Sequence, residues 1–84
     1  MYKIIFQKSA GKALEKIPNS ISERILLKIN TLKENPYPQG VKKLVGSDSL
    51  YRIRIGEYRV IYSVFQQILT IEIIRIGHRK DVYS

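Results

Sequence analysis

The stretch from residue 50 to residue 64 constrains the fold more than any other part of the chain. Its side chains alternate between apolar and basic or polar on both sides of the dipeptide Gly56-Glu57. Alternation with a period of two is typical of a half-buried β-strand, and glycine in the first of two turn positions favours a type II′ hairpin turn. The pattern therefore predicts two antiparallel strands with one apolar face and an opposite face that carries Arg52, Arg54 and Arg59.

The other segments predict a strand, two helices and two more strands. Apolar residues between 9 and 35 recur at helical spacing, and Pro18 and Pro36 interrupt that pattern. Ser20 and Glu23 match a capping box at the start of the second helix. In order, we predict a strand at 2–7, helices at 9–17 and 20–35, a strand at 41–46, the two hairpin strands, a last strand at 68–76, and a turn or short helical segment at 77–83.

This order predicts an α+β fold in a single domain that spans residues 1–84. Short turns make the last four strands an antiparallel meander. Each helix has one apolar stripe, so the helical hairpin should cover one face of the sheet and leave the other face open. The last strand is ambiguous: its alternation up to Ile73 breaks at Ile74 and Ile76, which requires either a bulge or burial on both faces.

The balance of charges points to an acidic partner. The chain carries 15 Lys and Arg against 7 Asp and Glu, a formal net charge of +8 at pH 7. Such an excess on a small domain indicates nucleic acid, an anionic membrane or an acidic protein as partner, with solubility as the alternative explanation. No apolar run approaches the roughly 20 residues that a membrane helix requires, so we expect a cytoplasmic protein that does not enter a membrane.

Several kinds of active site are excluded by the residues that the chain lacks. It has no cysteine, which excludes disulfides and thiolate zinc sites. One histidine and scattered carboxylates supply neither a metal-ligand cluster nor a nucleophile triad, and the five glycines are dispersed rather than gathered in a phosphate loop. We therefore expect no metal and no cofactor, and the cationic side chains remain as candidates.

Each of these side chains has a plain structural explanation as well. Arginines on an amphipathic strand are often only its solvated face, and Arg59 can form an ion pair with Glu57 or Glu72. His78 can be a surface or capping histidine, and Tyr83 can pack the C-terminus against the sheet. A site is favoured by the conjunction: two neighbouring strands place arginine opposite their apolar faces, and the last strand is followed by His-Arg-Lys and a tyrosine.

Two motifs carry a resemblance to a known family. They are Tyr-Arg-x-Arg-x-Gly-x-Tyr-Arg-x-x-Tyr at residues 51–62 and Gly-His-Arg-x-x-Val-Tyr at residues 77–83. With the preceding strand and helical hairpin, they resemble the RelE branch of the RelE/ParE toxin superfamily over nearly the whole chain. The resemblance implies a type II toxin that cuts messenger RNA on the ribosome without a metal, by attack of the ribose 2′-hydroxyl. It also implies a RelB-like antitoxin, in a complex that can bind operator DNA.

The resemblance implies roles for individual residues. Arg59 and Arg79 match the family's phosphate-stabilising positions, and guanidinium groups suit the charge that develops on an attacked phosphate. Arg52 and Arg54 match positions where the best-known RelE enzyme carries lysines, one of them proposed as general base. Because arginine is a poor proton acceptor, these two residues are assigned to RNA binding.

Proton transfer is assigned to the one histidine, whose unperturbed pKa lies near neutrality, with help from the tyrosine that matches the family's C-terminal tyrosine. The predicted catalytic residues are Arg59, His78, Arg79 and Tyr83. The predicted RNA-binding residues are Lys42, Lys43, Arg52, Arg54 and Lys80.

Two other functions fit the same fold. A ParE-like toxin would poison DNA gyrase instead of cutting RNA, and a basic surface suits both activities. A degraded toxin would keep only the ability to bind its antitoxin. Arg59, together with the C-terminal Gly-His-Arg-x-x-Val-Tyr motif, favours the nuclease.

Overall fold

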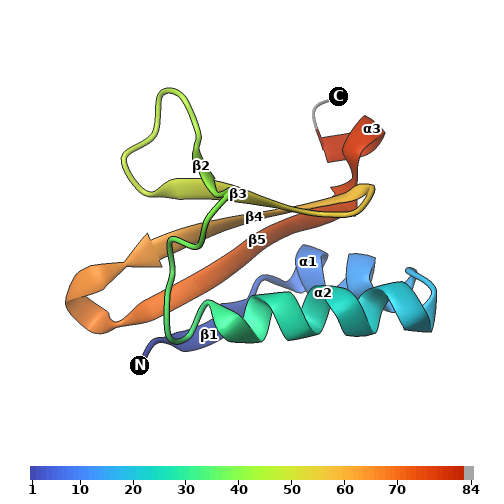
Figure 1. Cartoon of the computed structure of the whole chain (residues 1–84), viewed down its shortest axis with the longest axis horizontal. Coiled ribbons are helices and arrows are strands. Elements are labelled where there is room, and N and C mark those ends of the chain that lie inside the picture. Colours follow the sequence, from blue (N-terminus) through green and yellow to red (C-terminus); the bar gives the residue numbers. More distant parts are fainter. Residues whose placement is uncertain (83–84) are drawn as a thin grey trace.

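A five-stranded sheet with two helices against one of its faces forms the body of the protein (Figure 1). The computed structural model describes residues 1–82. Across the sheet, the strands follow the order β1-β5-β4-β3-β2. Along the chain, the elements are β1 (Lys3–Phe6), α1 (Lys8–Glu15), α2 (Asn19–Thr31), β2 (Lys42–Lys43), β3 (Leu50–Ile55), β4 (Tyr58–Phe65), the 3-10 turn η1 (Gln66–Ile68), β5 (Thr70–His78) and α3 (Arg79–Val82).

The topology confirms the predicted α+β fold. Strands β2 to β5 pair antiparallel with their neighbours in sequence, which is the expected meander. Strand β1 pairs in parallel with β5 and forms the other edge of the sheet. Figure 1 shows α1 and α2 below the sheet and the short α3 on the opposite side. No helix within residues 1–82 is long and apolar enough to cross a membrane.

The core lies between the sheet and the two long helices. Ile25 and Ile29 of α2 and the following Leu32 are buried, at the spacing of four and three residues that an amphipathic helix requires. The sheet contributes Ile53, Ile55, Val60, Tyr62, Val64, Ile71, Ile73 and Ile76 to the same cluster. The apolar face that the alternation predicts is therefore the face that the helices cover.

The hairpin turn between β3 and β4 fits the predicted type. Gly56 has a φ of 59°, whereas Glu57 has a negative φ. This combination fits a type II′ turn and excludes type I′, in which both central residues have positive φ. Since glycine adopts positive φ at little cost, Gly56 fixes the turn and with it the strand register.

The capping box at Ser20 was a wrong prediction. Helix α2 begins at Asn19, Pro18 takes the cap position, and no side chain caps the helix. The carbonyl oxygen of Pro18 already accepts hydrogen bonds from the N–H groups of Ile21 and Ser22, so the first turn forms before Ser20 can act as a cap.

A β-bulge in β5 explains the change of parity seen in its sequence. The register with β4 shifts between Ile61 and Tyr62, which leaves Ile74 as an extra residue. The bulge reverses the alternation along β5. As a result Ile76 faces the core, and Arg75 turns to the open face of the sheet.

Tyr62 ties the sheet to the segment that follows α2. Its side chain is fully buried, and its hydroxyl donates a 2.7 Å hydrogen bond to the carbonyl oxygen of Pro36. Burial, with smaller contributions from Tyr51 and Tyr37, raises the pKa of the Tyr62 hydroxyl far above its usual range. The hydroxyl therefore remains a donor at any physiological pH.

The variant Tyr62→Phe should lower the free energy of unfolding by about 1–3 kcal/mol, because a buried carbonyl loses its donor. Tyr37→Phe is the matched control: the Tyr37 hydroxyl accepts an equally short hydrogen bond of 2.7 Å from Gln66 Nε2, but at an exposed position. It should change stability by less than about 0.5 kcal/mol. Urea denaturation measures the free energy of unfolding of both variants. Equal losses would show that the buried hydrogen bond of Tyr62 stabilises the protein no more than the exposed one of Tyr37.

Candidate nucleic-acid interface

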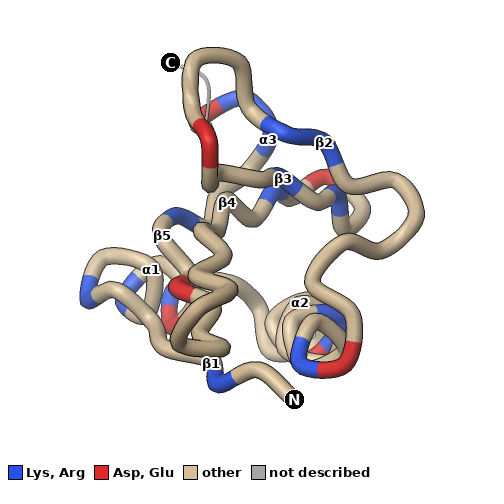
Figure 2. The backbone as a smooth tube through the Cα atoms, turned by 90° about the vertical axis from the view of Figure 1, so that its left-hand side faces the viewer, with Lys and Arg blue, Asp and Glu red and all other residues tan. Residues whose placement is uncertain are grey.

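Strand register brings four of the predicted basic residues to the open face of the sheet. Arg54 of β3 pairs directly with Arg59 of β4, and Arg52 of β3 pairs with Lys42 of β2. Paired residues project to the same face, and the intervening Ile53 is buried on the helical face. These four cations therefore share the face opposite α1 and α2. Figure 2 shows the basic positions of β2 and β3 close together.

Arg54 and Arg59 face each other across the hairpin as like charges. Like charges directly opposite on a sheet destabilise it. The β5 residue paired with Arg59 is Gly77, so the described strands place no carboxylate beside the two arginines in this row. A bound anion would relieve the repulsion, and the planar fork of a guanidinium matches the oxygens of a phosphate.

Arg59 is held in place by neutral groups of the backbone. Only 7 % of its surface is exposed, and its Nη1 donates to the carbonyl oxygens of Gly56, at 3.1 Å, and of Tyr58, at 3.0 Å. In the described part of the chain, these carbonyls take the place of the ion pair with Glu57 or Glu72 that the sequence left open. Carbonyls orient the guanidinium without cancelling its charge.

Arg79 meets the same hairpin turn from the end of β5. Its backbone N–H donates to the carbonyl oxygen of Glu57 at 2.8 Å, and its Nε lies 2.9 Å from Glu57 Oε2. The two side chains are 54 % and 61 % exposed, so solvent screens this ion pair and a phosphate can compete for the arginine. The turn thus gathers Arg59 at Gly56 and Arg79 at Glu57.

The structure does not bring His78 to the arginines. His78 pairs with Tyr58 of β4, and the two rings meet edge to face with centroids 5.6 Å apart. The histidine lines a groove with Lys16 and Ile17, next to the end of α1. Its Nδ1 accepts the backbone N–H of Lys80 at 3.2 Å. This contact makes it the cap of α3, which was the plain structural alternative.

Two other predicted residues, Lys43 and Lys80, are not part of the arginine pairing on the open face. Lys43 pairs with Tyr51, which packs against the core, so the register directs Lys43 toward the helical side. Lys80 is exposed on α3. Tyr83 lies outside the described residues.

Within residues 1–82, no three His, Cys, Asp or Glu side chains are grouped so that they could hold a metal ion.

Arg75 is a cation of the open face that was not predicted as a site residue. Simple alternation along β5 would point it into the core, and the bulge at Ile74 reverses this. Its Nη2 donates to the carbonyl oxygen of Asp81 in α3 at 3.0 Å. The parity switch between Ile74 and Ile76 was the one sequence signal for this placement.

Helix α3 packs over the end of the arginine row, which is the pair Arg54 and Arg59 that Gly77 continues across the sheet. A Cβ added at Gly77 would lie 3.0 Å from Val82 Cγ2, and Val82 is buried. Because Gly77 is paired with Arg59, the missing side chain lets α3 approach the sheet beside that arginine.

The variant Gly77→Ala should push α3 from the sheet and lower the free energy of unfolding by about 1 kcal/mol, because overpacking strains the contact. Val82→Ala removes the contacted methyl group. The double variant Gly77→Ala/Val82→Ala should therefore lose less stability than the sum of the single variants. Thermal denaturation of the four proteins measures this coupling, and strict additivity would contradict the contact.

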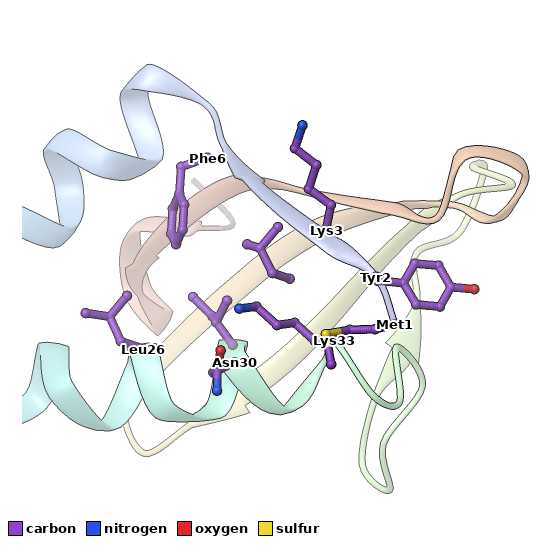
Figure 3. Close-up of a pocket in the computed structure, with 9 residues that line it drawn as sticks. Met1, Tyr2, Lys3, Phe6, Leu26, Asn30 and Lys33 are labelled. Carbon is purple, nitrogen blue, oxygen red and sulfur yellow. The ribbon is translucent and has the colours of Figure 1, made fainter.

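A separate groove of about 400 Å³ lies between β1 and α2 (Figure 3). Phe6 extends from β1 toward the helix and Leu26 extends from α2 toward the strand, whereas Lys3 points away from the helix. Phe6 and Leu26 are 37 % and 43 % exposed, so apolar surface is open to solvent here. Among residues 1–82, those that line the groove include no carboxylate and no histidine, which favours a docking surface over an active site.

Known proteins of similar sequence and structure are toxins of toxin–antitoxin pairs. The sequence model of a family described as the ParE toxin of the type II toxin-antitoxin system, parDE, matches residues 4–83. The chain is 36 % identical to toxin RelE3 of Methanocaldococcus jannaschii, over 98 % of this chain and 96 % of that protein. One chain of the archaeal RelE–RelB complex from Pyrococcus horikoshii is similar with a TM-score of 0.84 and 35 % identity, covering 95 % of this chain and 97 % of that chain. For the intact Escherichia coli RelBE toxin–antitoxin complex, the TM-score is 0.83 and the identity 25 %, covering 93 % and 96 %.

Proposed function

The chain belongs to the RelE/ParE superfamily of type II toxins, and we propose that it is a ribosome-dependent endoribonuclease that cleaves messenger RNA and so inhibits translation. The observation that carries the proposal is the pairing of Arg54 with Arg59 on the open face, with Arg52 and Lys42 beside them. A cationic face of this kind suits a phosphodiester chain. The similarity to RelE3 supports the RelE-type activity.

The proposed reaction uses the RNA's own nucleophile and no metal. The ribose 2′-oxygen attacks the adjacent phosphorus, and the bond from phosphorus to the 5′-oxygen breaks. The products are a 2′,3′-cyclic phosphate and a 5′-hydroxyl. One proton leaves the 2′-hydroxyl and one reaches the 5′-oxygen. Negative charge grows on the non-bridging oxygens, where a preorganised donor is worth roughly 3 kcal/mol.

Arg59 is the strongest candidate for stabilising that charge. The carbonyls of Gly56 and Tyr58 already orient its guanidinium, so little reorganisation is needed when the phosphate arrives. Arg79 can exchange its exposed partner Glu57 for a phosphate oxygen. The neighbouring cations of the open face then bind the flanking phosphates.

The assignment of proton transfer to His78 follows from the acid–base chemistry of imidazole and not from the position of its ring. An imidazole can both accept and donate a proton, but the Nδ1 of His78 accepts the Lys80 N–H and its ring lies beside Tyr58. Its Nε2 is the nitrogen left to exchange a proton, and it would act from the helical side of β5. The assisting role of Tyr83 stays a prediction. We therefore assign the larger share of catalysis to the arginines.

The variant Arg59→Ala should lower the cleavage rate by about 100-fold or more. Arg59→Lys, which keeps the charge but loses the fork, should recover only part of it. His78→Ala should cost less than Arg59→Ala. Cleavage of message on purified ribosomes across a range of pH measures all three, with thermal unfolding as the check on folding. A His78→Ala loss as large as that of Arg59→Ala, with a flattened pH profile near neutrality, would place the histidine at the centre of the reaction.

Mapping RNA ends after induced expression tests the function itself. We expect cuts confined to translated reading frames, with a cyclic phosphate on the upstream fragment and a 5′-hydroxyl on the downstream fragment. Intact messages in arrested cells would refute the nuclease.

A ParE-like gyrase poison is the second candidate, because the family model that matches carries the ParE description. Supercoiling by purified gyrase in the presence of the protein separates the two, and we expect no inhibition. A module that only binds antitoxin would cut no RNA, leave gyrase active and allow normal growth.

The proposed partner is a RelB-like antitoxin, since the similar P. horikoshii and E. coli structures pair RelE with RelB. In the part of the chain that the structure describes, strand β1 pairs with β5 alone, and the groove beside it exposes Phe6 and Leu26. An added strand or an amphipathic helix suits such a surface. The net charge of +8 favours an acidic antitoxin, and the complex is the form that would bind operator DNA.

The variant Phe6→Asp should weaken antitoxin binding about tenfold or more, because it places a charge in an apolar contact. Phe65→Asp is the matched control, since Phe65 is 41 % exposed at the far end of β4. Titration calorimetry with the antitoxin measures both affinities. Equal effects of the two variants would show that the groove is not the docking surface.

A further inference from the structure

A second group of cations extends from Arg54 into a groove between α2 and β3. The groove has a volume of about 470 Å³, and Arg24 and Lys28 of α2 line it together with Arg54 of β3. Among the described residues that line it, none is a carboxylate. Arg24 and Lys28 stand one helical turn apart, where like charges repel, so the grouping is unfavourable until an anion binds.

Strand pairing leaves this groove open. Strand β2 pairs only with Tyr51 and Arg52, so within the described chain the edge of β3 at residues 53–55 has no neighbouring strand. At the end of that edge, the two Nη atoms of Arg24 lie 3.8 Å from the position that a Cβ would take at Gly56. The guanidinium of Arg24 on α2 therefore reaches the hairpin turn.

Arg54 connects the groove to the open face. Its register places its side chain opposite Arg59 on the open face, and Arg54 is also one of the residues that line the groove with Arg24. Leu27, which is 70 % exposed, offers an apolar surface there for a ribose or a base. A phosphodiester chain bound on the open face can therefore continue around the uncovered edge of β3 and onto α2.

We propose that this groove is a second phosphate-binding site, in which Arg24, Lys28 and Arg54 hold RNA backbone that flanks the cleaved bond. The inference rests on the proposed function for the kind of nucleic acid, and on the charge and position of the groove for the site. The phosphates can come from the message or from ribosomal RNA, which share this chemistry.

A double variant, Arg24→Ala/Lys28→Ala, tests the site against a matched control. The control, Lys8→Ala/Lys12→Ala, removes two exposed positive charges at the same spacing from α1. For a labelled single-stranded RNA oligonucleotide, the groove variant should raise Kd about tenfold and lower the slope of log K against log salt by about 1.4, since each phosphate contact contributes roughly 0.7. The control should change Kd less than twofold, because salt screens distant charges. Thermal unfolding confirms that both variants fold.

Cleavage of message on programmed ribosomes is the second arm, where the groove variant should raise KM about tenfold with kcat within twofold.

An effect on ribosomes alone assigns the phosphates to ribosomal RNA, and an effect in both arms assigns them to the message. Equal behaviour of the two double variants in both arms would overturn the site, as would a loss of antitoxin affinity alone or a wild-type protein that binds neither the oligonucleotide nor the programmed ribosome. Oligonucleotide binding through the groove without any cleavage would overturn the proposed function and leave the site standing.

Discussion

The register of the β3–β4 hairpin is the constraint on which the rest of the structure depends. Because side chains alternate with a period of two, a slip of one residue would turn Arg52 and Arg54 into the core and expose Ile53. Burying guanidinium groups without compensating partners costs far more than a single apolar contact gains. Gly56 supports the one acceptable register by adopting the positive φ that the tight turn requires. The covered core and the basic face are two results of the same pairing.

The basic face is ordered although its charges repel. Each of three arginines has a hydrogen-bonding partner of its own: Arg59 has the carbonyls of the turn, Arg79 has Glu57, and Arg75 has the carbonyl of Asp81. Two of these partners are neutral backbone groups and the third is exposed to solvent. The face therefore presents oriented positive charge that is incompletely neutralised, which is the condition for binding an anion with little reorganisation.

Within the RelE/ParE superfamily, the cationic set of this chain favours binding over proton transfer. Arginine stays protonated at physiological pH and offers two parallel N–H donors to a phosphate, which lysine cannot do. Positions 52 and 54 carry arginine. His78, which we propose for proton transfer, is engaged as the cap of α3. The structure therefore offers several oriented arginines that can stabilise negative charge, whereas the histidine that could transfer a proton already accepts a hydrogen bond.

The sequence by itself determined the order of the elements, the hairpin and its turn at Gly56, and the face on which its arginines lie, because alternation and turn chemistry are local. Tertiary structure alone decided that Ile74 bulges and sends Arg75 to the open face, that His78 lies toward α1, and that β1 joins β5 in parallel. Each of these depends on which strand lies alongside and in what register. Pairing energy is shared between residues far apart in the chain, so no local pattern could specify it.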